Sequence, residues 1–524
     1  MNELHRQLAA RLDGDVRDDP FSRIHYSVDA SIYQIDPQLV VMPRHDDDVR
    51  AAVAFAREHA IPVVARGAAT GIAGGAIGPG MVIDFARYMN KILELDADRR
   101  YAVVQPGVIQ DQLNAAAAEH GLRFGPDTST GNRATLGGML GNNSSGAHSL
   151  RYGKTNDNLR RVECMLTSGQ TVTLDKFPAA ELQQRIDAGG PAAAVWKEVA
   201  RVRDELADEI HARYPKIERR VSGYSLDAVL GDEIDAAALF CGSEGTLGLA
   251  TQIEVDLVPC PGASGLVVVQ FDDAVAGLER VPFMLAHDPA SVELIDDHII
   301  RTGRQSPSMK GKTDWLQGEP GGLIVAEFDG DTAAAVDDKL AQFEAALARE
   351  GIGHEYLRLT EGTAMANVWE LRKAGLGLLL ASRSAEKAVA FLEDSAVPVD
   401  KVAAYMKRLR EYTREAGKEA GFYGHAGAGL IHVRPMIDLE NQADVDLMVK
   451  IMRDAAQMLL EYGGSLSGEH GDGLVRSWLI ETMYGPRLTA AFRDMKRAFD
   501  PDALMNPGKI VDPPPMTENL RVDP

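Results

Sequence analysis

Short apolar runs alternate with amphipathic stretches along the first half of the chain. Residues 40–42 form an apolar run that Pro43 closes, and the three aspartates at 46–48 offer caps for a helix over 49–56. The next apolar run, 61–65, ends at an Arg-Gly pair. A strand, a helix and a strand joined by a tight glycine turn predict an α/β arrangement. Two further strands are predicted at 81–84 and 102–104.

The second half combines apolar runs with longer helical periods. A Pro-Cys-Pro-Gly stretch at 259–262 predicts a domain boundary. After it, the pattern predicts an α+β domain over 265–460, with its sheet covered by helices on one face. The predicted strands are 266–269 and 323–326, and the predicted helices are 192–211, 333–350, 399–416 and 486–499.

Composition and charge narrow the class of protein. The chain has 524 residues and a net charge of −22, which disfavours nucleic acid and anionic membranes as partners. Its 3 cysteines are too few for a disulfide framework or an iron–sulfur cluster of its own. There is neither an apolar run of membrane-spanning length nor a signal peptide at the N-terminus. We therefore expect a cytoplasmic protein, with attachment to the inner membrane through an electron-transfer partner as the alternative.

Three loops rich in glycine and hydroxyl residues lie in the first domain, at 66–76, 131–146 and 242–248. Small residues let backbone N–H groups approach an anion. The spacing matches neither a dinucleotide-fold motif nor a Walker loop. One such loop could be an ordinary turn, but three on one domain suit a long ligand with a pyrophosphate at its centre.

These loops resemble the FAD-binding domain of the vanillyl-alcohol-oxidase superfamily. The matching segments are 62–67, 106–108, 134–138 and 242–248, with 506–510 resembling the C-terminal signature of that family. The resemblance implies an α+β fold: a PCMH-type FAD-binding domain of two subdomains, an α+β substrate domain, and a C-terminal segment that returns to the flavin. The implied divisions are an N-terminal helical segment at 1–35, the FAD-binding domain at 36–260, the substrate and metal domain at 261–460, the returning segment at 461–512 and a proline-rich tail at 513–524.

The resemblance also assigns the cofactor site. The first glycine-rich loop, 66–76, carries Ala68 and Ala69 where some relatives tether FAD through a histidine, so we expect non-covalent FAD. His148, in the next loop, is interpreted as a polar loop residue, with a tether as the alternative. The predicted cofactor-binding residues are Arg66, Gly67, Ala68, Ala69, Thr70, Gly71, Gly74, Pro126, Thr128, Thr135, Gly137, Gly138, Asn142, Ser145, Gly146, Glu244, Gly245, Gly248 and Asn506.

A second group of polar residues lies near the end of the substrate domain. His425 and His432 are seven apart, with glycines between them that predict a turn followed by a strand carrying His432. Together with Glu469 they form a pattern of three ligands and an open position, as in catalytic zinc sites. Unrelated polar residues are the alternative that the spacing alone leaves open.

This arrangement resembles the FAD-dependent D-2-hydroxyacid dehydrogenases. That resemblance implies that His425, His432 and Glu469 bind a divalent metal, with zinc expected and manganese or iron as alternatives. It makes His470 the catalytic base. A metal would lower the pKa of the substrate hydroxyl group, a histidine would take its proton, and the hydride would pass to flavin N5.

Two arginines are predicted to hold the substrate carboxylate as planar forks. Arg372 matches a substrate-binding arginine of the family, and Arg434 stands where the 2-hydroxyglutarate enzymes have asparagine. Leu376 and Leu392 replace residues that are polar there, which favours D-lactate over D-2-hydroxyglutarate. Surface ion pairing is the alternative for each arginine. Glu393 and Asp394 are interpreted as a structural pair beside the site.

The sequence thus predicts an FAD- and metal-dependent D-2-hydroxyacid dehydrogenase. The proline-rich tail resembles a linker to an iron–sulfur half, which would be the electron acceptor as a domain or subunit, or else a quinone or cytochrome chain. A disordered terminus is the alternative for the tail, and a homodimer is an open alternative for the assembly. The competing functions are an oxygen-using flavin oxidase of alcohols or sugars and a non-catalytic flavin subunit that relays electrons.

Overall fold

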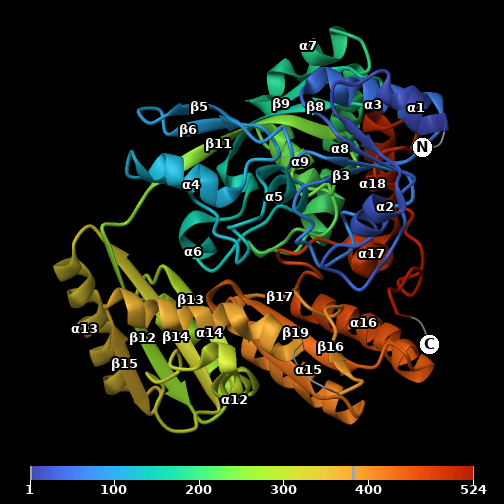
Figure 1. Ribbon diagram of the computed structural model, residues 1–524. Helices are drawn as coiled ribbons and strands as arrows, with labels where there is room; N and C mark the ends of the chain where they lie inside the picture. The colour runs from blue at the N-terminus through green and yellow to red at the C-terminus, as the bar shows by residue number, and fades with distance from the viewer. Residues whose placement is uncertain (1–2, 381–383, 523–524) are drawn as a thin grey trace.

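The computed structural model describes residues 3–380 and 384–522, which form two bodies (Figure 1). The first domain contains the N-terminal half and the C-terminal segment, and the second domain contains the chain between them. The chain leaves the first domain after β11 (Leu249–Pro259) and enters the second at β12 (Ala263–Phe271).

Within the described residues, the first domain contains two sheets. The smaller has one antiparallel pair at one edge and two parallel pairs beyond it. Its order is β1 (Asp15–Arg17), β2 (Leu39–Met42), β4 (Met81–Asp84) and β3 (Val63–Arg66). The larger is antiparallel, in the order β10 (Glu233–Asp235), β9 (Thr171–Pro178), β8 (Leu159–Met165), β11, β6 (Tyr101–Val104) and β5 (Ile92–Asp96), with β7 (Leu122–Phe124) also paired to β11.

The helix predicted at 49–56 is longer in the structure. It is α3 (Asp46–Glu58), and its N-cap is His45, whose side chain accepts a hydrogen bond from the backbone N–H of Asp48. The three aspartates lie in the first turn, where carboxylates interact favourably with the helix dipole. The other helices of this domain before the crossing are α1 (Glu3–Ala9), α2 (Pro20–Tyr26), α4 (Gln110–Ala118), α5 (Leu136–Asn142), α6 (Ser149–Tyr152), α7 (Leu182–Asp187), α8 (Ala192–Arg213) and α9 (Ala236–Phe240).

The second domain is built on one antiparallel sheet. In the described residues its order is β15 (Glu355–Leu359), β12, β14 (Gly322–Gly330), β13 (Ser291–Asp296), β18 (Ala420–Gly424), β19 (Leu430–Ile437) and β16 (Lys387–Ala388), with β17 (Ser395–Ala396) also paired to β19. Its helices are α10 (Ala274–Leu278), α11 (Val281–Leu285), α12 (Asp297–Gln305), α13 (Ala333–Glu350), α14 (Gly362–Leu380), α15 (Val402–Glu415) and α16 (Gln442–Tyr462).

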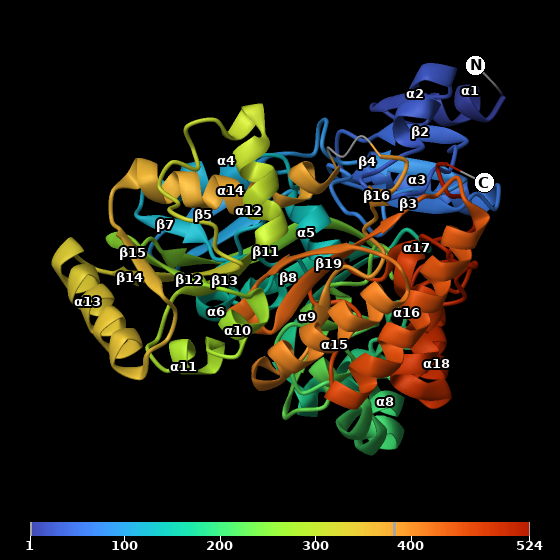
Figure 2. The ribbon, with the colours of Figure 1, turned by 90° about the horizontal axis from the view of Figure 1, so that it is seen from below.

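Both faces of this sheet are covered, so the prediction of one covered face was wrong. Leu266 and Val268 pack with residues of α12 and α14. Val267 and Val269, which point the other way, belong to the core that includes residues of α10, α13 and α15. Figure 2 shows these helices on opposite sides of the strands. The continuous apolar run of β12 is explained by this double burial.

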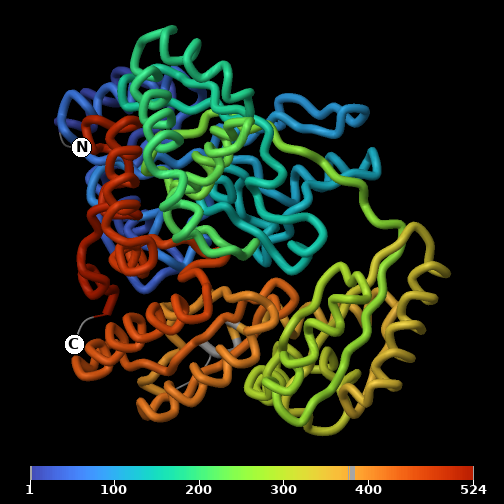
Figure 3. The backbone as a smooth tube through the Cα atoms, turned by 180° about the vertical axis from the view of Figure 1, so that it is seen from behind, coloured from blue at the N-terminus to red at the C-terminus, as the bar shows by residue number. Residues whose placement is uncertain are grey.

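The chain then returns to the first domain through α17 (Gly473–Arg476) and α18 (Ile480–Phe499), which lies against α8 (Figure 3). Gly485 and Pro486 kink α18, which is why only 486–499 was predicted as helix. Beyond it, Val63 of β3 donates its N–H to the carbonyl of Leu504, and Asn506 donates to that of Val63. The end of the chain therefore extends the first sheet.

The residues after Pro513–Pro515 pack against the N-terminal segment. Met516 and Leu520 are buried, and the hydroxyl of Tyr33 donates to the carbonyl of Met516. Arg521 donates to the carbonyls of Asp29 and Ser31. A disordered terminus is therefore ruled out for 516–522. None of the described helices combines the length and apolar character needed to cross a membrane.

Candidate active site

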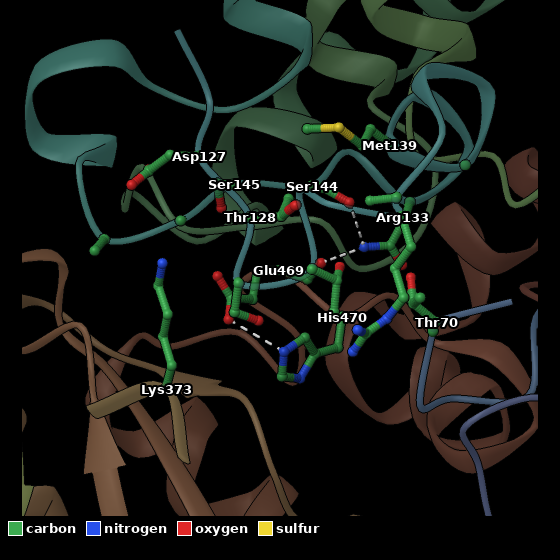
Figure 4. A pocket seen from close by; sticks show the side chains of 18 of the residues that line it. Thr70, Asp127, Thr128, Arg133, Met139, Ser144, Ser145, Lys373, Glu469 and His470 are labelled. Carbon is green, nitrogen blue, oxygen red and sulfur yellow. Dashed lines mark hydrogen bonds and ion pairs between the residues drawn. The ribbon is translucent and has the colours of Figure 1, made fainter. Parts of the chain in front are cut away.

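The glycine-rich loops and a wall of the second domain enclose a cavity of about 1420 Å³ (Figure 4). This exceeds the roughly 300–1,000 Å³ of a site for a drug-sized ligand, so a dinucleotide and a small substrate could be held together. The predicted cofactor residues that line it are Arg66, Gly67, Ala68, Ala69, Thr70, Gly71, Thr128, Thr135, Gly137, Gly138, Asn142, Ser145, Gly146, Glu244, Gly245 and Gly248.

The first two loops lie in direct contact because their residues are small. A Cβ atom on Gly67 would be 2.1 Å from the hydroxyl of Thr135, and one on Gly137 would be 2.6 Å from Pro106. The Thr135 hydroxyl caps α5 by accepting a hydrogen bond from the N–H of Gly138. The backbone itself therefore forms this wall, as a pyrophosphate site requires.

Three predicted cofactor residues do not line the cavity. Gly74 has a φ of +81° and packs against Tyr33. The carbonyl of Pro126 accepts from Gln110 at 2.5 Å. Asn506 donates to the carbonyls of Gly75 and Glu244, at 2.8 and 2.6 Å, so it ties two loops together from behind.

Glu469 lies at the centre of the polar cluster. Its Oε1 is 3.3 Å from His432 Nε2 and 3.1 Å from His470 Nε2, while its Oε2 is 3.3 Å from His425 Nε2. All four predicted residues are thus together in one wall of the cavity. The glycine turn at 426–429 sets His425 before β19 and His432 on it, as predicted.

Both predicted substrate arginines line the cavity, but each is paired with a buried glutamate. Arg372 of α14 lies 2.8 Å from Glu293 of β13, which also accepts from His425 Nδ1 at 2.8 Å. Arg434 of β19 pairs with Glu393. The pairs are internal rather than on the surface, and they use much of the charge that a substrate carboxylate would need. Leu392 is buried and Leu376 lies outside the residues whose side chains are described.

The tightest potential metal-binding set differs from the predicted trio. Among the described residues, Asp394, His432, Glu469 and His470 can each place one ligand atom within 4.8 Å of all the others. His425 is outside this set, although it is close to Glu469. Two buried carboxylates and three histidines at one point fit a divalent cation.

Burial and neighbouring charges shift the pKa values of the three histidines in different directions. Burial lowers the pKa of His432 to about 3. Burial also disfavours the charged forms of His425 and His470, but Glu293 raises the pKa of His425 and Asp394 raises that of His470. Burial opposes the ionisation of Glu469 as well, yet His425 and other cations hold its pKa well below the usual range. His432 is therefore neutral, as a metal ligand must be.

Several important residues carry no motif and were missed. Arg219 is buried and donates to Glu469 Oε2 at 2.8 Å and to the carbonyl of Gly146 at 2.6 Å. Arg133 and Lys373 line the cavity without a carboxylate partner among the described residues. A lone basic residue in a loop or helix gives no sequence signal for such a role.

His148 connects the two domains. Its Nδ1 is 2.5 Å from Asp127 and its Nε2 is 3.0 Å from Glu327 of β14. Burial opposes its charge, but the two carboxylates raise the pKa of His148 to about 11. Both ring nitrogens are occupied, which disfavours a flavin tether here.

Two family models match the chain. Residues 37–175 match the model described as FAD binding domain, and residues 261–510 match FAD linked oxidases, C-terminal domain. The cavity lies between the parts of the chain that these models cover.

Named relatives match almost the whole chain. A D-2-hydroxyglutarate dehydrogenase of Pantoea ananatis is 32% identical over 95% of this chain, which spans only 50% of that protein. A D-lactate dehydrogenase of Archaeoglobus fulgidus is 28% identical over 90% of this chain and 91% of its own length. The structure of p-cresol methylhydroxylase with substrate bound superposes with a TM-score of 0.69 and 14% identity, covering 98% and 97% of the two chains. The chain thus spans about half the length of the first of these relatives.

Proposed function

Because the chain belongs to the FAD-linked oxidases and has their PCMH-type fold, we propose that it oxidises a D-2-hydroxy acid to the 2-oxo acid. The observation that carries the proposal is the meeting of three histidine Nε2 atoms on the Glu469 carboxylate, in the wall of the cavity that the FAD loops line. An electron-relay subunit would need FAD but not this cluster.

The residues of the chain supply binding and proton transfer. His470 Nε2 lies beside Glu469 in the wall of the cavity and would take the hydroxyl proton of the substrate. FAD, held without a covalent bond by the loops at 66–76, 131–146 and 242–248, would accept the hydride. Arg372 and Arg434 form the polar wall beside these groups.

His425, His432 and Glu469 would hold a divalent cation, with zinc expected and manganese or iron as alternatives. The cluster fits it, because Glu469 is ionised and His432 is neutral. When bound, the cation would lower the pKa of the substrate hydroxyl group. His470 and Asp394 are close enough to complete the donor set.

Two substrates are proposed. D-lactate is favoured by the pairing of Arg372 and Arg434 with glutamates, because little free positive charge is left there for a second carboxylate. D-2-hydroxyglutarate, the alternative, is favoured by Lys373, which lines the same wall and has no carboxylate partner among the described residues, and by the Pantoea ananatis relative. For the electrons, the acceptor proposed is an iron–sulfur domain or subunit, or else a quinone or cytochrome chain, on the resemblance of the proline-rich tail to the linker of iron–sulfur relatives.

Anaerobic addition of substrate tests this function. Metal-replete protein should lose its flavin absorbance with D-lactate or D-2-hydroxyglutarate, and the faster of the two identifies the substrate. EDTA treatment should slow the bleaching, and added zinc should restore it. If no member of a broad D-2-hydroxyacid panel reduces the flavin, the proposed reaction is wrong. Rapid peroxide formation in air would instead indicate an oxidase.

A further inference from the structure

Glu393 is a fully buried carboxylate that contacts both catalytic-site histidines from one side. The same oxygen, Oε1, lies 3.3 Å from His432 Nδ1 and 3.4 Å from His470 Nδ1. Glu393 is 0% exposed. Neither Nδ1 atom has a hydrogen-bond partner among the described residues, so the contacts with Glu393 are close charge contacts at these distances. Glu393 is therefore the carboxylate placed to fix both rings.

The two imidazole rings are parallel and lie between two carboxylates. Their centroids are 5.0 Å apart and their planes differ by 14°. Oε1 of Glu393 faces both Nδ1 atoms, and Oε1 of Glu469 faces both Nε2 atoms, at 3.3 and 3.1 Å. Each ring therefore has its Nδ1 edge toward Glu393 and its Nε2 edge toward Glu469.

Arg434 holds Glu393 in place. Its guanidinium group is 1% exposed, pairs with Glu393 and donates from Nε to the Tyr423 hydroxyl at 3.1 Å. A buried carboxylate without a counter-charge would be strongly disfavoured, and Arg434 supplies that counter-charge to Glu393. The charge of Arg434 is thus engaged inside the protein.

We propose that Glu393, held by Arg434, is a positioning residue that keeps the proton of both His432 and His470 on Nδ1. This inference rests on the proposed oxidation and goes beyond it. A carboxylate that faces Nδ1 favours the tautomer with Nδ1–H. Glu469 faces Nε2 at similar distances, and a cation bound at Glu469 would offset that carboxylate and leave each Nε2 with its lone pair. That lone pair lets His432 bind a cation and lets His470 accept a proton. Arg434 then acts through Glu393 instead of clamping the substrate.

Stopped-flow flavin reduction separates these two roles of Arg434. For Arg434→Met and Glu393→Gln, the limiting reduction rate should fall about 10–100-fold while the substrate Kd stays within about twofold. The double variant should lose no more than either single variant, because both act through one carboxylate. If Arg434→Met raises the substrate Kd and leaves the limiting rate unchanged, Arg434 is a substrate clamp and the proposal is wrong.

Zinc affinity gives a readout that needs no substrate. Dialysed oxidised protein, titrated with zinc against a fluorescent chelator, should bind about 10–100-fold more weakly in Glu393→Gln than in wild type. Equal affinity together with equal limiting rates would overturn the positioning role. Failure of wild-type reduction by every hydroxy acid would instead refute the proposed function, and the zinc titration would still decide the tautomer question.

Controls separate positioning from folding. Arg410→Met breaks a partly exposed arginine–carboxylate pair, with Asp273 at 2.6 Å, in the same domain but outside the cavity, and should leave both readouts unchanged. The double variant Glu393→Gln/Arg434→Met removes both buried charges together, so it should fold even if a single variant does not. Thermal melting and FAD content confirm that each variant is folded.

Discussion

At the scale of single residues, the reactive groups are placed by hydrogen bonds from the loop that carries them. Asp394 is fully buried and has a left-handed φ of +85°. Its carboxylate accepts from the Ser467 hydroxyl at 2.5 Å and from the N–H groups of His470 and Glu469 at 2.8 and 3.1 Å. One side chain thus fixes the start of the segment that contains His470, the proposed base.

We expect Asp394→Asn to disturb this segment. The amide group presents N–H toward backbone N–H, so at least one hydrogen bond to a charged acceptor is lost, at a cost of about 1.5–3 kcal/mol in the free energy of unfolding. Flavin reduction should slow while FAD content is kept. Denaturant titration and stopped-flow absorbance measure the two effects, and Asp400→Asn, on the surface of the same domain, is the control. Unchanged stability and rate would show that Asp394 does not hold the loop.

The base itself is tested by His470→Ala. Removing a general base slows proton transfer by roughly 10²–10⁴-fold, so anaerobic reduction should fall by that factor. FAD content should be retained, and zinc content is measured alongside because His470 lies within reach of the predicted ligands. Reduction at the wild-type rate would reject His470 as the base and point to another group.

The residues that the sequence made predictable are those within short motifs. His425, His432, Glu469 and His470 stand in two glycine-rich segments, and the structure brings them together. Glu393 was picked out only as a structural residue beside the site and Glu293 was not picked out, because each is paired with an arginine 41 or 79 residues away. Such pairs are created by tertiary folding and carry no local pattern.

At the scale of elements, the glycine-rich loops at 66–76 and 131–146 can form the cavity wall because their backbones lie in direct contact. Gly67→Ala should displace the Thr135 hydroxyl that caps α5, since the new Cβ would be 2.1 Å from it. Purified protein should contain much less FAD, with little change in circular dichroism. Gly231→Ala, where the nearest atom is 3.4 Å away, is the control in the same domain. Normal FAD content in Gly67→Ala would exclude this loop from the binding site.

Periodicity predicted several elements, including α13 at its observed bounds. It failed where distant segments decide the outcome. The second face of the β12 sheet is covered by α12 and α14, which lie far along the chain, although the continuous apolar run of β12 is consistent with burial on both faces. The tail beyond Pro515 reads as polar and proline-rich, yet Leu520 finds a buried place beside Tyr33.

At the scale of the whole molecule, His148 links the domains by charge. Its folded pKa of about 11 lies above its unfolded value of about 6.5, so its contribution to stability is complete below pH 6.5 and is lost as the pH rises toward 11. The apparent melting temperature of wild type should therefore fall between pH 7 and 10, and His148→Gln should flatten that fall. Glu327→Gln should do so in part, and His120→Gln, on the surface, should not. Equal slopes in wild type and His148→Gln would contradict this linkage.

The Asn506 side chain joins the first loop to the third from a position 431 residues beyond Gly75. During synthesis, the loops that receive FAD therefore emerge long before the residue that locks them together. At about 5–20 residues per second, the ribosome needs roughly 20–90 seconds to cover that distance. Over that interval the nascent chain has an unfinished pocket, so FAD capture is completed only after nearly all of this chain has been translated.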